Sequence, residues 1–396
     1  MRTYIFTDLV GDEREFFSNY FNVKPMLRKS SLPGDPRDIL SIRQLDELVN
    51  LEVIRPPYIK ANLNGSGVPE IGYTRNVVIQ GVTVTDIVDP AKLYALYRAG
   101  ATLTWCSLNH ITPGLRAFTR MISDQMTVRT DSVAFLTPAG KPGYPVHHDP
   151  VDLFIVQLEG TKRWRLWDPG PTRHSTAEGY TEESLGEPSI QTELQPGDVM
   201  YLPYGTPHAA AAQEKASLHL SIMMRPRRWK DLLLDTVERV AQDPEFDSYP
   251  HLGEWRQEAT EETFREKISV LAARLTGIDA AAELDRLAEA GRTMPGSSEG
   301  HTFQSITDAD DLEPESWLRL GSAQVGFGEN VNGRVEVTID GGRIAIPGSV
   351  AELLATLSGE AQLQASEVIP GADHTRSVRA ARALVKAGVL ELVGER

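Results

Sequence analysis

Short apolar runs, separated by Gly, Pro and Asp, fill the chain from about residue 75 to 225. Runs of this length and punctuation are typical of strands in an all-β sandwich or barrel. The segments that we expect to be strands are Ser132–Leu136, Asp152–Gln157, Lys162–Trp167, Val199–Leu202 and Ser217–Met224. Ahead of them, residues 12–26 have the apolar spacing of an amphipathic helix that ends before Pro25.

Helical spacing replaces the strand pattern after Pro226. Apolar residues recur on one helical face from Trp229 to Val240, and on another from Phe264 to Leu275. Such a small helical unit has little volume with which to close a core of its own. We therefore expect it to pack on the barrel or on a second copy of itself, which makes a homodimer a reasonable hypothesis.

Residues 291–315 are polar and rich in Gly and Pro, which predicts a linker. Beyond it, two β-type runs within 334–346 are split by Gly341-Gly342, and helical stretches around 350–357 and 376–387 precede a short strand at 389–393. This order favours a winged helix. The predicted domains are 1–226, 227–315 and 316–396.

The amino-acid composition is that of a folded protein, and the net charge disfavours one class of binding partner. Hydrophobic residues make up 41% and charged residues 24% of the 396 positions, so wholesale disorder is excluded. The 55 Asp and Glu residues outnumber the 40 Lys and Arg residues, and the net charge of −15 disfavours nucleic acid as the main partner. A single cysteine, no apolar run of signal-peptide length and no stretch of about 18 apolar residues predict a cytoplasmic protein without a membrane segment.

The first chemical signal is the sequence Tyr-Pro-Val-His-His-Asp-Pro-Val-Asp-Leu-Phe from position 144, which leads into a strand. Alternate side chains of an extended segment share a face, so His147 and Asp149 point the same way and His148 points oppositely. His147 is therefore the better candidate for a metal ligand. A His-x-Asp by itself arises by chance in many proteins.

A second histidine strengthens this prediction. His208 closes the segment Gln-Pro-Gly-Asp-Val-Met-Tyr-Leu-Pro-Tyr-Gly-Thr-Pro-His from position 195, in which a turn, a short strand and a loop follow one another. Several strands fit between Asp149 and His208 and could bring the two residues together across a barrel. Two imidazoles and one carboxylate leave positions open on the metal, as is typical of non-haem Fe(II) oxygenases.

Lys162 lies on the strand that returns after Gly160, where it shares a face with Trp164 and Leu166. If that face is inward, Lys162 is buried without an acidic partner on its strand face, which is costly. A carboxylate of 2-oxoglutarate would satisfy it. The alternative is an edge-like strand with a solvated lysine.

On a later strand, His219 and Ser221 share a polar face that points either into the site or to solvent. His219 is equally well a structural histidine or a contact to the co-substrate.

The segment Thr-Pro-Ala-Gly-Lys-Pro-Gly-Tyr-Pro-Val-His-His-Asp-Pro-Val-Asp-Leu-Phe-Ile-Val-Gln-Leu-Glu-Gly-Thr-Lys-Arg-Trp from position 137 resembles the signature of the JmjC/cupin-type ribosomal oxygenases. Residues 17–25 are similar to the family's N-terminal aromatic and Lys-Pro segment. The resemblance implies a mainly β catalytic domain with the double-stranded β-helix or cupin jelly-roll fold, followed by a helical dimerisation unit and a C-terminal winged helix.

The resemblance also implies the chemistry. It assigns Fe(II) to His147, Asp149 and His208, and the distal carboxylate of 2-oxoglutarate to Lys162, with O₂ as the second co-substrate. The implied substrate is an Arg or His residue in a ribosomal protein, or alternatively a residue in a precursor peptide. An acidic enzyme suits a basic protein substrate.

Two positions depart from the family pattern. Many relatives carry a polar residue and a Tyr on the strand before the Thr-Pro-Ala-Gly turn, where this chain has Val133 and Phe135. Neither side chain can donate a hydrogen bond to a carboxylate, which puts co-substrate contacts there in doubt. Ser221 on the later strand is the candidate to substitute for them.

Two other classes of function remain open. One is a cupin ligand sensor fused to a DNA-binding winged helix, with Arg376, Arg379, Arg382 and Lys386 facing phosphates. However, residues 330–396 hold seven basic and eight acidic residues, where a DNA-binding module is usually clearly basic. The other is a metal-dependent cupin enzyme that does not use 2-oxoglutarate, and such an enzyme has no need for a buried Lys162.

Overall fold

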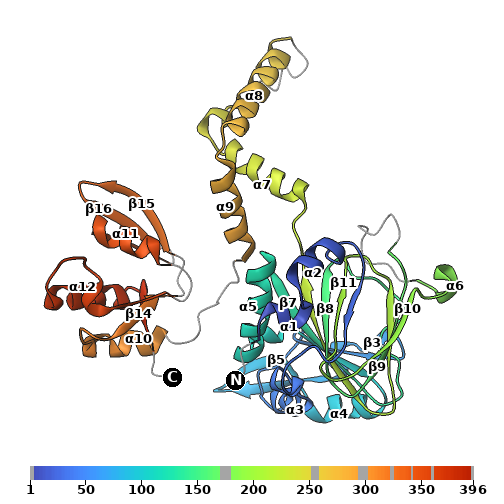
Figure 1. Cartoon of the computed structure of the whole chain (residues 1–396). Helices are drawn as coiled ribbons and strands as arrows, with labels where there is room; N and C mark the ends of the chain where they lie inside the picture. The colour runs from blue at the N-terminus through green and yellow to red at the C-terminus, as the bar shows by residue number, and fades with distance from the viewer. Residues whose placement is uncertain are drawn as a thin grey trace. The chain divides into compact units, whose positions relative to one another are not determined.

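The computed structural model describes residues 4–169, 180–250, 258–292, 302–321, 325–339, 342–357 and 361–393. The chain divides into two compact units, residues 1–293 and 294–396, and each is described by itself (Figure 1). The sequence predicts further boundaries at 226 and 315, and this finer division stays a prediction.

The first unit is built on an eight-stranded sheet, in which all neighbouring strands are antiparallel. Its strands, in spatial order, are β1 (Met26–Arg28), β11 (Val199–Leu202), β8 (Asp152–Glu159), β13 (Ser217–Met224), β7 (Thr130–Thr137), β6 (Thr102–Cys106), β2 (Ile59–Leu63) and β3 (Ser66–Gly67). The strands predicted around residues 132, 152, 199 and 217 all form, because alternating apolar positions bury one or both faces.

A second, three-stranded sheet completes the barrel. Its order is β10 (Ile190–Leu194), β9 (Lys162–Leu166) and β12 (His208–Ala212), again antiparallel. The side chains that pack between the two sheets form the barrel interior, which consists of Val151, Leu153, Ile155, Trp164, Leu166, Leu194, Met200 and Leu202. This arrangement of two facing sheets is the mainly β jelly roll that the sequence predicts.

The outer face of the large sheet packs on helices from the N-terminal half, as Figure 1 shows for α1 (Phe6–Val10), α2 (Glu13–Asn19) and α5 (Pro113–Met126). The helix predicted over 12–26 ends earlier, at Asn19. Asn22 then adopts a left-handed backbone conformation (φ 55°), and its N–H donates to the Tyr201 hydroxyl at 2.9 Å. A contact to a distant strand therefore ends the helix, and the chain enters β1.

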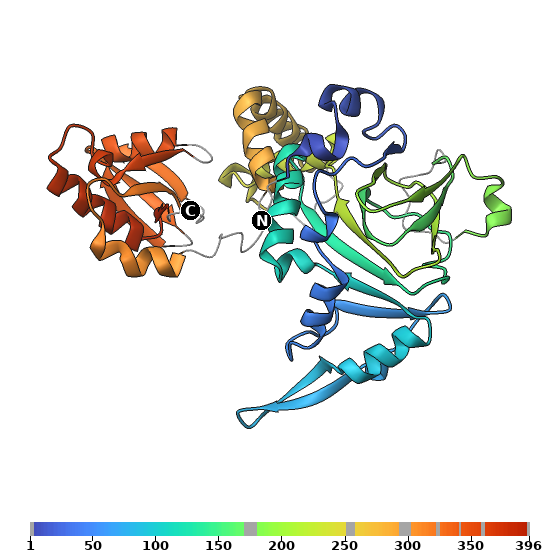
Figure 2. The ribbon, with the colours of Figure 1, turned by 60° about the horizontal axis from the view of Figure 1, so that its bottom comes forward.

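The first unit also contains a separate two-stranded sheet and three further helices. Helices α3 (Ile42–Val49) and α4 (Pro90–Arg98) accompany a separate hairpin of β4 (Thr74–Ile79) and β5 (Val82–Val88), and α6 (Glu182–Leu185) follows β9. Figure 2 shows the hairpin extending away from the barrel. Val78 and Val82 on this hairpin are exposed.

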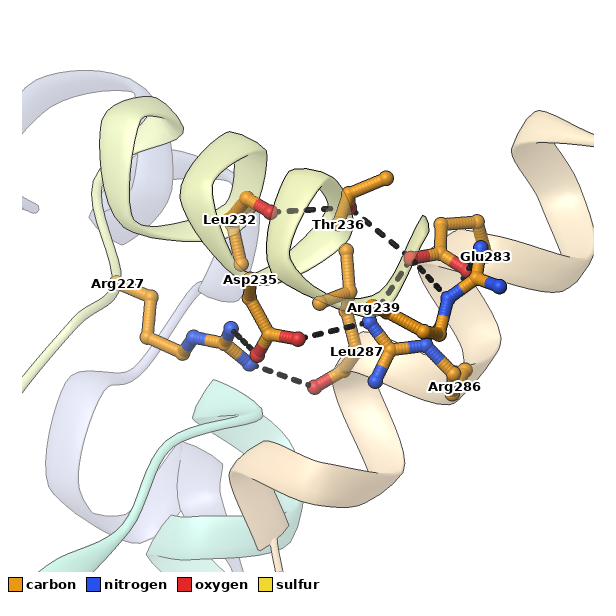
Figure 3. A network of polar contacts seen from close by, with 8 residues as sticks. All are labelled: Arg227, Leu232, Asp235, Thr236, Arg239, Glu283, Arg286 and Leu287. Atoms are coloured by element: carbon orange, nitrogen blue, oxygen red, sulfur yellow. Dashed lines mark hydrogen bonds and ion pairs between the residues drawn. The ribbon is translucent and has the colours of Figure 1, made fainter. Parts of the chain in front are cut away.

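Three helices follow the barrel: α7 (Trp229–Ala241), α8 (Glu258–Thr276) and α9 (Ala280–Arg292). A network of charged side chains joins α7 to α9 (Figure 3), in which Arg286 donates to Asp235 at 2.9 Å and to Glu283 at 2.8 Å. Arg227, just before α7, donates to Asp235 at 2.6 Å, and Arg239 donates to Glu283 at 2.8 Å. The network therefore links α7 and Arg227 to α9.

The second unit contains α10 (Thr302–Asp308) and a 3₁₀ turn at Ala309–Asp311, which lie within the segment 291–315 that the sequence predicts to be a linker. Residues 293–301 of that segment lie outside the described residues. Leu312 and Ala309 are buried in the core of the second unit, and this packing explains the difference.

Two three-stranded sheets follow in the second unit. They consist of β18 (Gln362–Gln364), β14 (Trp317–Leu320) and β19 (Leu390–Leu392), and of β15 (Val325–Val331), β16 (Arg334–Ile339) and β17 (Gly342–Pro347). Helices α11 (Gly348–Thr356) and α12 (His374–Lys386) pack with them. Gly341 of the predicted turn lies outside the described residues. The winged-helix assignment stays a prediction.

None of the helices in the described part of the chain combines the length and apolar character needed to cross a membrane.

Candidate functional site

Two histidines face each other where the loop before β8 meets the start of β12. His147 and His208 form an isolated antiparallel bridge, with backbone N–H to oxygen distances of 3.2 Å and 2.8 Å. Their ring centroids are 4.5 Å apart. Residues 61 positions apart in the sequence are thus held together by backbone hydrogen bonds, so their side chains have a fixed mutual orientation.

Asp149 completes a group of three possible ligands. Its Oδ2 lies 3.9 Å from Nε2 of His147 and 3.7 Å from Nε2 of His208. One ligand atom from each of the three residues lies within 4.8 Å of the others, a spacing that a single metal ion can bridge. Among the described residues, this is the one such group of three or more His, Cys, Asp and Glu side chains.

Hydrogen bonds set the tautomer of both histidines. Nδ1 of His147 lies 2.7 Å from the carbonyl oxygen of Pro145, and Nδ1 of His208 lies 2.9 Å from that of Thr206. A carbonyl only accepts, so each Nδ1 carries the proton and each Nε2 has its lone pair free. Metal-ligating histidines are typically oriented in this way.

Burial and the neighbouring His147 lower the pKa of His208 to about 4, although the nearby Asp149 acts in the opposite direction. His208 is therefore neutral at physiological pH, which is the form that binds a metal.

His148 points away from this group, as the strand parity predicts. It is 1% exposed, and its Nδ1 lies 2.7 Å from the Tyr180 hydroxyl. The structure therefore separates the two adjacent histidines into one that faces Asp149 and one that anchors the loop on the other side.

Lys162 lies inside the barrel, 2% exposed. Its Nζ is 3.2 Å from Oγ1 of Thr137 and 3.2 Å from Nδ1 of His219, and no described acidic residue pairs with it. Burial lowers the pKa of Lys162 to about 7. The alternative of a solvated lysine on an edge strand is thus wrong, because β9 lies between β10 and β12.

His219 and Ser221 look into the barrel, while Leu218, Leu220 and Ile222 are buried on the outer face of the sheet. His219 contacts Lys162 directly, and burial, followed by the charge of Lys162, lowers the pKa of His219 well below its ordinary value. Ser221 lies opposite Val133 and Ile155 in the sheet, and its role as a co-substrate contact stays a prediction.

Phe135 occupies the strand position at which many members of the resembled family carry a Tyr. Its ring stacks on His219 with 4.9 Å between centroids and 5° between planes. Tyr144 approaches Phe135 edge-on at 5.8 Å and lies 6.1 Å from His147, and its hydroxyl is 2.8 Å from Oγ1 of Thr104. The sequence reasoning did not single out Tyr144, which brings a phenol to the side of the site that Phe135 leaves apolar.

The aromatic rings around the site form a closed circuit. Trp164 lies 5.9 Å from His208 and 5.2 Å from His219, which continues through Phe135 and Tyr144 back to His147. Strand alternation places Trp164 of β9 on the inner face of the small sheet, and Phe135 of β7 and His219 of β13 on the inner face of the large sheet. The rings of His147 and His208 close the circuit at 4.5 Å, so the two candidate histidine ligands are part of the same set of aromatic contacts as Trp164, His219, Phe135 and Tyr144.

Asp131 is a second residue near the site that the sequence patterns did not single out. It lies on β7 two residues before Val133 and opposite Met223, which packs on the barrel interior. Its carboxylate accepts hydrogen bonds from Oγ of Ser107 at 2.7 Å and from the Ser132 N–H at 2.8 Å. Its place two residues from Val133 in an alternating strand was the sequence signal.

The part of the chain that holds the site is similar to known proteins. A JmjC domain family model matches residues 109–232, which include all three candidate ligands and Lys162. Ribosomal oxygenase 1 of Rattus norvegicus is 32% identical over 206 residues, covering 47% of this chain and 34% of that protein. The bifunctional lysine-specific demethylase and histidyl-hydroxylase NO66 of Aedes aegypti is 25% identical over 233 residues, covering 55% of this chain and 34% of that protein.

The chain thus spans about a third of the length of these curated relatives. Among solved structures, the ribosomal oxygenase YcfD from Escherichia coli in complex with cobalt and 2-oxoglutarate is similar with a TM-score of 0.53 and 17% identity, covering 98% of this chain and 99% of that one. This likeness shows a shared fold along almost the whole chain. In sequence, residues 109–232 match the JmjC domain family model, and 47% of the chain is similar to a ribosomal oxygenase.

Proposed function

We propose that this protein is an Fe(II)- and 2-oxoglutarate-dependent oxygenase that hydroxylates a C–H bond of a basic residue in a protein or peptide. The observation that carries the proposal is the pairing of two features inside one barrel. His147, Asp149 and His208 converge on one point, and Lys162 is a buried amine without an anionic partner among the described residues.

The donor set fits Fe(II). Two neutral imidazoles and one carboxylate on one side of a metal leave positions for a chelating co-substrate and for O₂. The backbone hydrogen bonds of both Nδ1 atoms aim Nε2 toward the carboxylate of Asp149. The side chains of His147 and Asp149 are 33% and 35% exposed, so this end of the site is open to a substrate, whereas the His208 side chain is 7% exposed.

The environment of Lys162 fits a dicarboxylate. A carboxylate beside Nζ would compensate the cost of burying the ammonium group, which no side chain in the described part of the chain does. Gly143 adds space: a Cβ built at this position would lie 3.6 Å from Nζ and 3.0 Å from the carbonyl oxygen of Ala210. The missing side chain leaves room for a ligand to reach the lysine.

When bound, Fe(II) with 2-oxoglutarate and O₂ supplies the oxidising power for C–H hydroxylation, with succinate and CO₂ as by-products. The protein's part is placement: Lys162 holds the distal end of the co-substrate, and the three ligands fix the reactive end. No protein acid or base is required.

Asp131 is an argument for a substrate residue with a basic side chain. Its carboxylate lies on the inner face of β7, and Oγ of Ser107 and the backbone N–H of Ser132 hold it in place. A guanidinium or imidazolium that enters from the open end would gain a charge-assisted hydrogen bond there. An Arg or His in a ribosomal protein is the favoured substrate, since relatives carry the names ribosomal oxygenase and histidyl-hydroxylase. A precursor peptide is the alternative.

The DNA-binding alternative is weaker than the charge pattern of α12 indicates. Arg382 donates to the carbonyl oxygen of Leu312 at 2.9 Å, and Lys386 pairs with Asp310 at 2.6 Å. Half of the predicted basic stripe is thus engaged within its own unit. A metal-dependent cupin without 2-oxoglutarate leaves the buried amine of Lys162 unexplained.

The decisive experiment combines co-substrate turnover with product detection. Purified protein with Fe(II) and ascorbate should convert 2-oxoglutarate to succinate slowly without substrate, and turnover equal to that of Asp149→Ala would refute the oxygenase. Lys162→Ala should lose affinity for 2-oxoglutarate, whereas Arg163→Ala, which alters the outward-facing neighbour, should retain it. Mass spectrometry of ribosomal proteins and candidate peptides after incubation should then find the gain of one oxygen on an Arg or His.

Asp131→Asn tests the substrate class separately. It should weaken binding of an Arg- or His-containing peptide about tenfold or more, because a charge-assisted hydrogen bond is lost. Succinate formation without substrate should be unchanged. Asp124→Asn, at an exposed position of α5, is the matched control. Equal peptide affinity for wild type and Asp131→Asn would contradict this role.

We further propose that the helical unit pairs with a second copy of the chain. Trp229, Leu233 and Leu234 on α7 are 72%, 61% and 64% exposed, and Phe264 and Ile268 on α8 are 66% and 50% exposed. Apolar surface on this scale in a small helical unit is typical of an interface.

A further inference from the structure

We propose that the indole N–H of Trp164 is a second donor to the distal carboxylate of the co-substrate, beside Lys162. The inference rests on the proposed function and assigns a binding role to a residue that the sequence reasoning treated only as part of the inner face of β9. Three observations support it. The indole N–H has no hydrogen-bond partner among the described residues, its ring lies beside Lys162, and Lys162 has few N–H donors left for a carboxylate.

Trp164 is 3% exposed, and its Nε1 is buried without a hydrogen-bond partner among the described residues. Leaving a buried N–H unpaired is costly, and such groups in folded proteins typically meet a water, an ion or a ligand. The indole ring packs in the barrel interior between His208 and His219. A ligand in that space is the available partner.

The position of Trp164 selects the distal carboxylate. On β9, Trp164 is two residues from Lys162 and therefore on the same face, with Nζ of Lys162 6.0 Å from the centre of a Trp164 ring. His219 contacts both residues, since its Nδ1 lies 3.2 Å from Nζ and its ring meets Trp164 edge-on. A carboxylate that binds Lys162 is thus adjacent to the indole.

Lys162 alone offers too few hydrogen bonds for a buried carboxylate. An ammonium group has three N–H donors, and contacts to Thr137 and His219 engage two of them. One donor then remains for two carboxylate oxygens, which together have about four lone-pair sites. The indole N–H of Trp164, which has no partner among the described residues, would supply another donor from a ring that lies beside Lys162.

Two other tryptophans provide internal comparisons. Trp105 also has a buried Nε1 without a partner among the described residues, but it packs in the cluster on the outer face of the large sheet. Trp167 donates its N–H to the carbonyl oxygen of Gly186 at 2.8 Å. Trp105→Phe is therefore the matched control, because it removes the same kind of group from outside the site.

The test compares two ligands on the Zn(II)-loaded protein by calorimetry. 2-Oxoglutarate carries the distal carboxylate, and 2-oxovalerate lacks it but is otherwise similar. Trp164→Phe should bind 2-oxoglutarate about tenfold or more weakly than wild type, since a hydrogen bond to a charged group is lost. Its affinity for 2-oxovalerate should stay within about twofold, and Trp105→Phe should match wild type for both ligands.

An equal loss of affinity for both ligands would assign Trp164 a merely structural role and overturn the inference. Unchanged affinity for 2-oxoglutarate would overturn it as well. If the wild-type protein itself fails to bind 2-oxoglutarate, the proposed function fails first, so the two failures are distinguishable.

The wild-type protein gives an independent readout that does not need a stable Trp164 variant. The chain has six tryptophans, whose indole ¹⁵N–¹H signals can be assigned by replacing the other five one at a time. The Trp164 signal should shift downfield and become protected from solvent exchange when 2-oxoglutarate is added, and not when 2-oxovalerate is added. A Trp164 signal that responds equally to both ligands would contradict the contact.

Discussion

Nζ of Lys162 lies 3.2 Å from Nδ1 of His219, so two buried nitrogen groups are in direct contact inside the barrel. Burial lowers the pKa of Lys162 to about 7 and that of His219 well below its ordinary value. No carboxylate in the described part of the chain pairs with Lys162 and compensates for the burial of its charge. This arrangement is consistent with the proposed binding of an anionic co-substrate, and the stability of the ligand-free protein should depend on pH.

The first prediction concerns the stability of the ligand-free protein. Below pH about 7, Lys162 is charged in both the folded and the unfolded state, and the folded state bears the full cost of burial. Between about 7 and the ordinary value of 10.5, unfolding takes up a proton, so the free energy of unfolding rises with pH. Lys162→Met lacks this dependence, and its advantage over wild type should be larger at pH 6 than at pH 10 by at least about 1 kcal/mol.

Urea denaturation at the two pH values measures this difference. Lys215→Met, at an exposed position, is the control and should show the same stability difference from wild type at both. A Lys162→Met variant that is less stable than wild type at pH 6 would mean that the buried amine is already compensated in the ligand-free protein.

The second prediction separates the two adjacent histidines. His147→Ala and Asp149→Ala should each weaken Co(II) or Zn(II) binding by about 100-fold or more, because each removes one of three ligand atoms. His148→Phe should keep the metal, since its side chain faces Tyr180 on the other side of the loop. Metal content after dialysis against a weak chelator measures the effect, and loss of metal from His148→Phe equal to that from His147→Ala would contradict the assignment.

The third prediction concerns the network between α7 and α9. Hydrogen bonds, chiefly from Arg286, lower the pKa of Glu283 to about 2, from an ordinary value of 4.5. This depressed pKa contributes stability above pH about 4.5 that is lost as the pH falls toward 2. Glu283→Gln should cost on the order of 1–2 kcal/mol at pH 7 and less at pH 3.

Thermal unfolding followed by circular dichroism tests this cost. Glu261→Gln, which alters an exposed pair with Arg265 on α8, should change stability by less than about 0.5 kcal/mol. If both variants behaved alike, the network would be an ordinary set of surface ion pairs.

The fourth prediction concerns self-association. Light scattering after size exclusion at micromolar concentration should give the mass of a dimer for wild type, and Leu233→Glu should shift it to monomer because a charge would be buried in the interface. Val78→Glu, on the β4–β5 hairpin, alters a residue that is 71% exposed and should leave the dimer intact. A wild-type protein that stays monomeric would remove the proposal.

The sequence by itself determined the features that depend on local alternation. Strand parity separated His147 from His148 and placed Lys162 on the Trp164 face, because neighbouring side chains in a strand must point oppositely. The same pattern located the strands at 132, 152, 162, 199 and 217 with boundaries that differ by at most a few residues from those of the structure. Local geometry is sufficient for such features.

Only the tertiary structure decided which of these faces meet. The backbone bridge from His147 to His208, the contact of Lys162 with His219 and the approach of Tyr144 to Phe135 join segments far apart in the sequence. The lack of a partner for the Trp164 indole among the described residues also follows only from the packing of its neighbours. Likewise, α2 ends at Asn19 through a contact with a distant strand, because long-range packing overrides the local helical pattern.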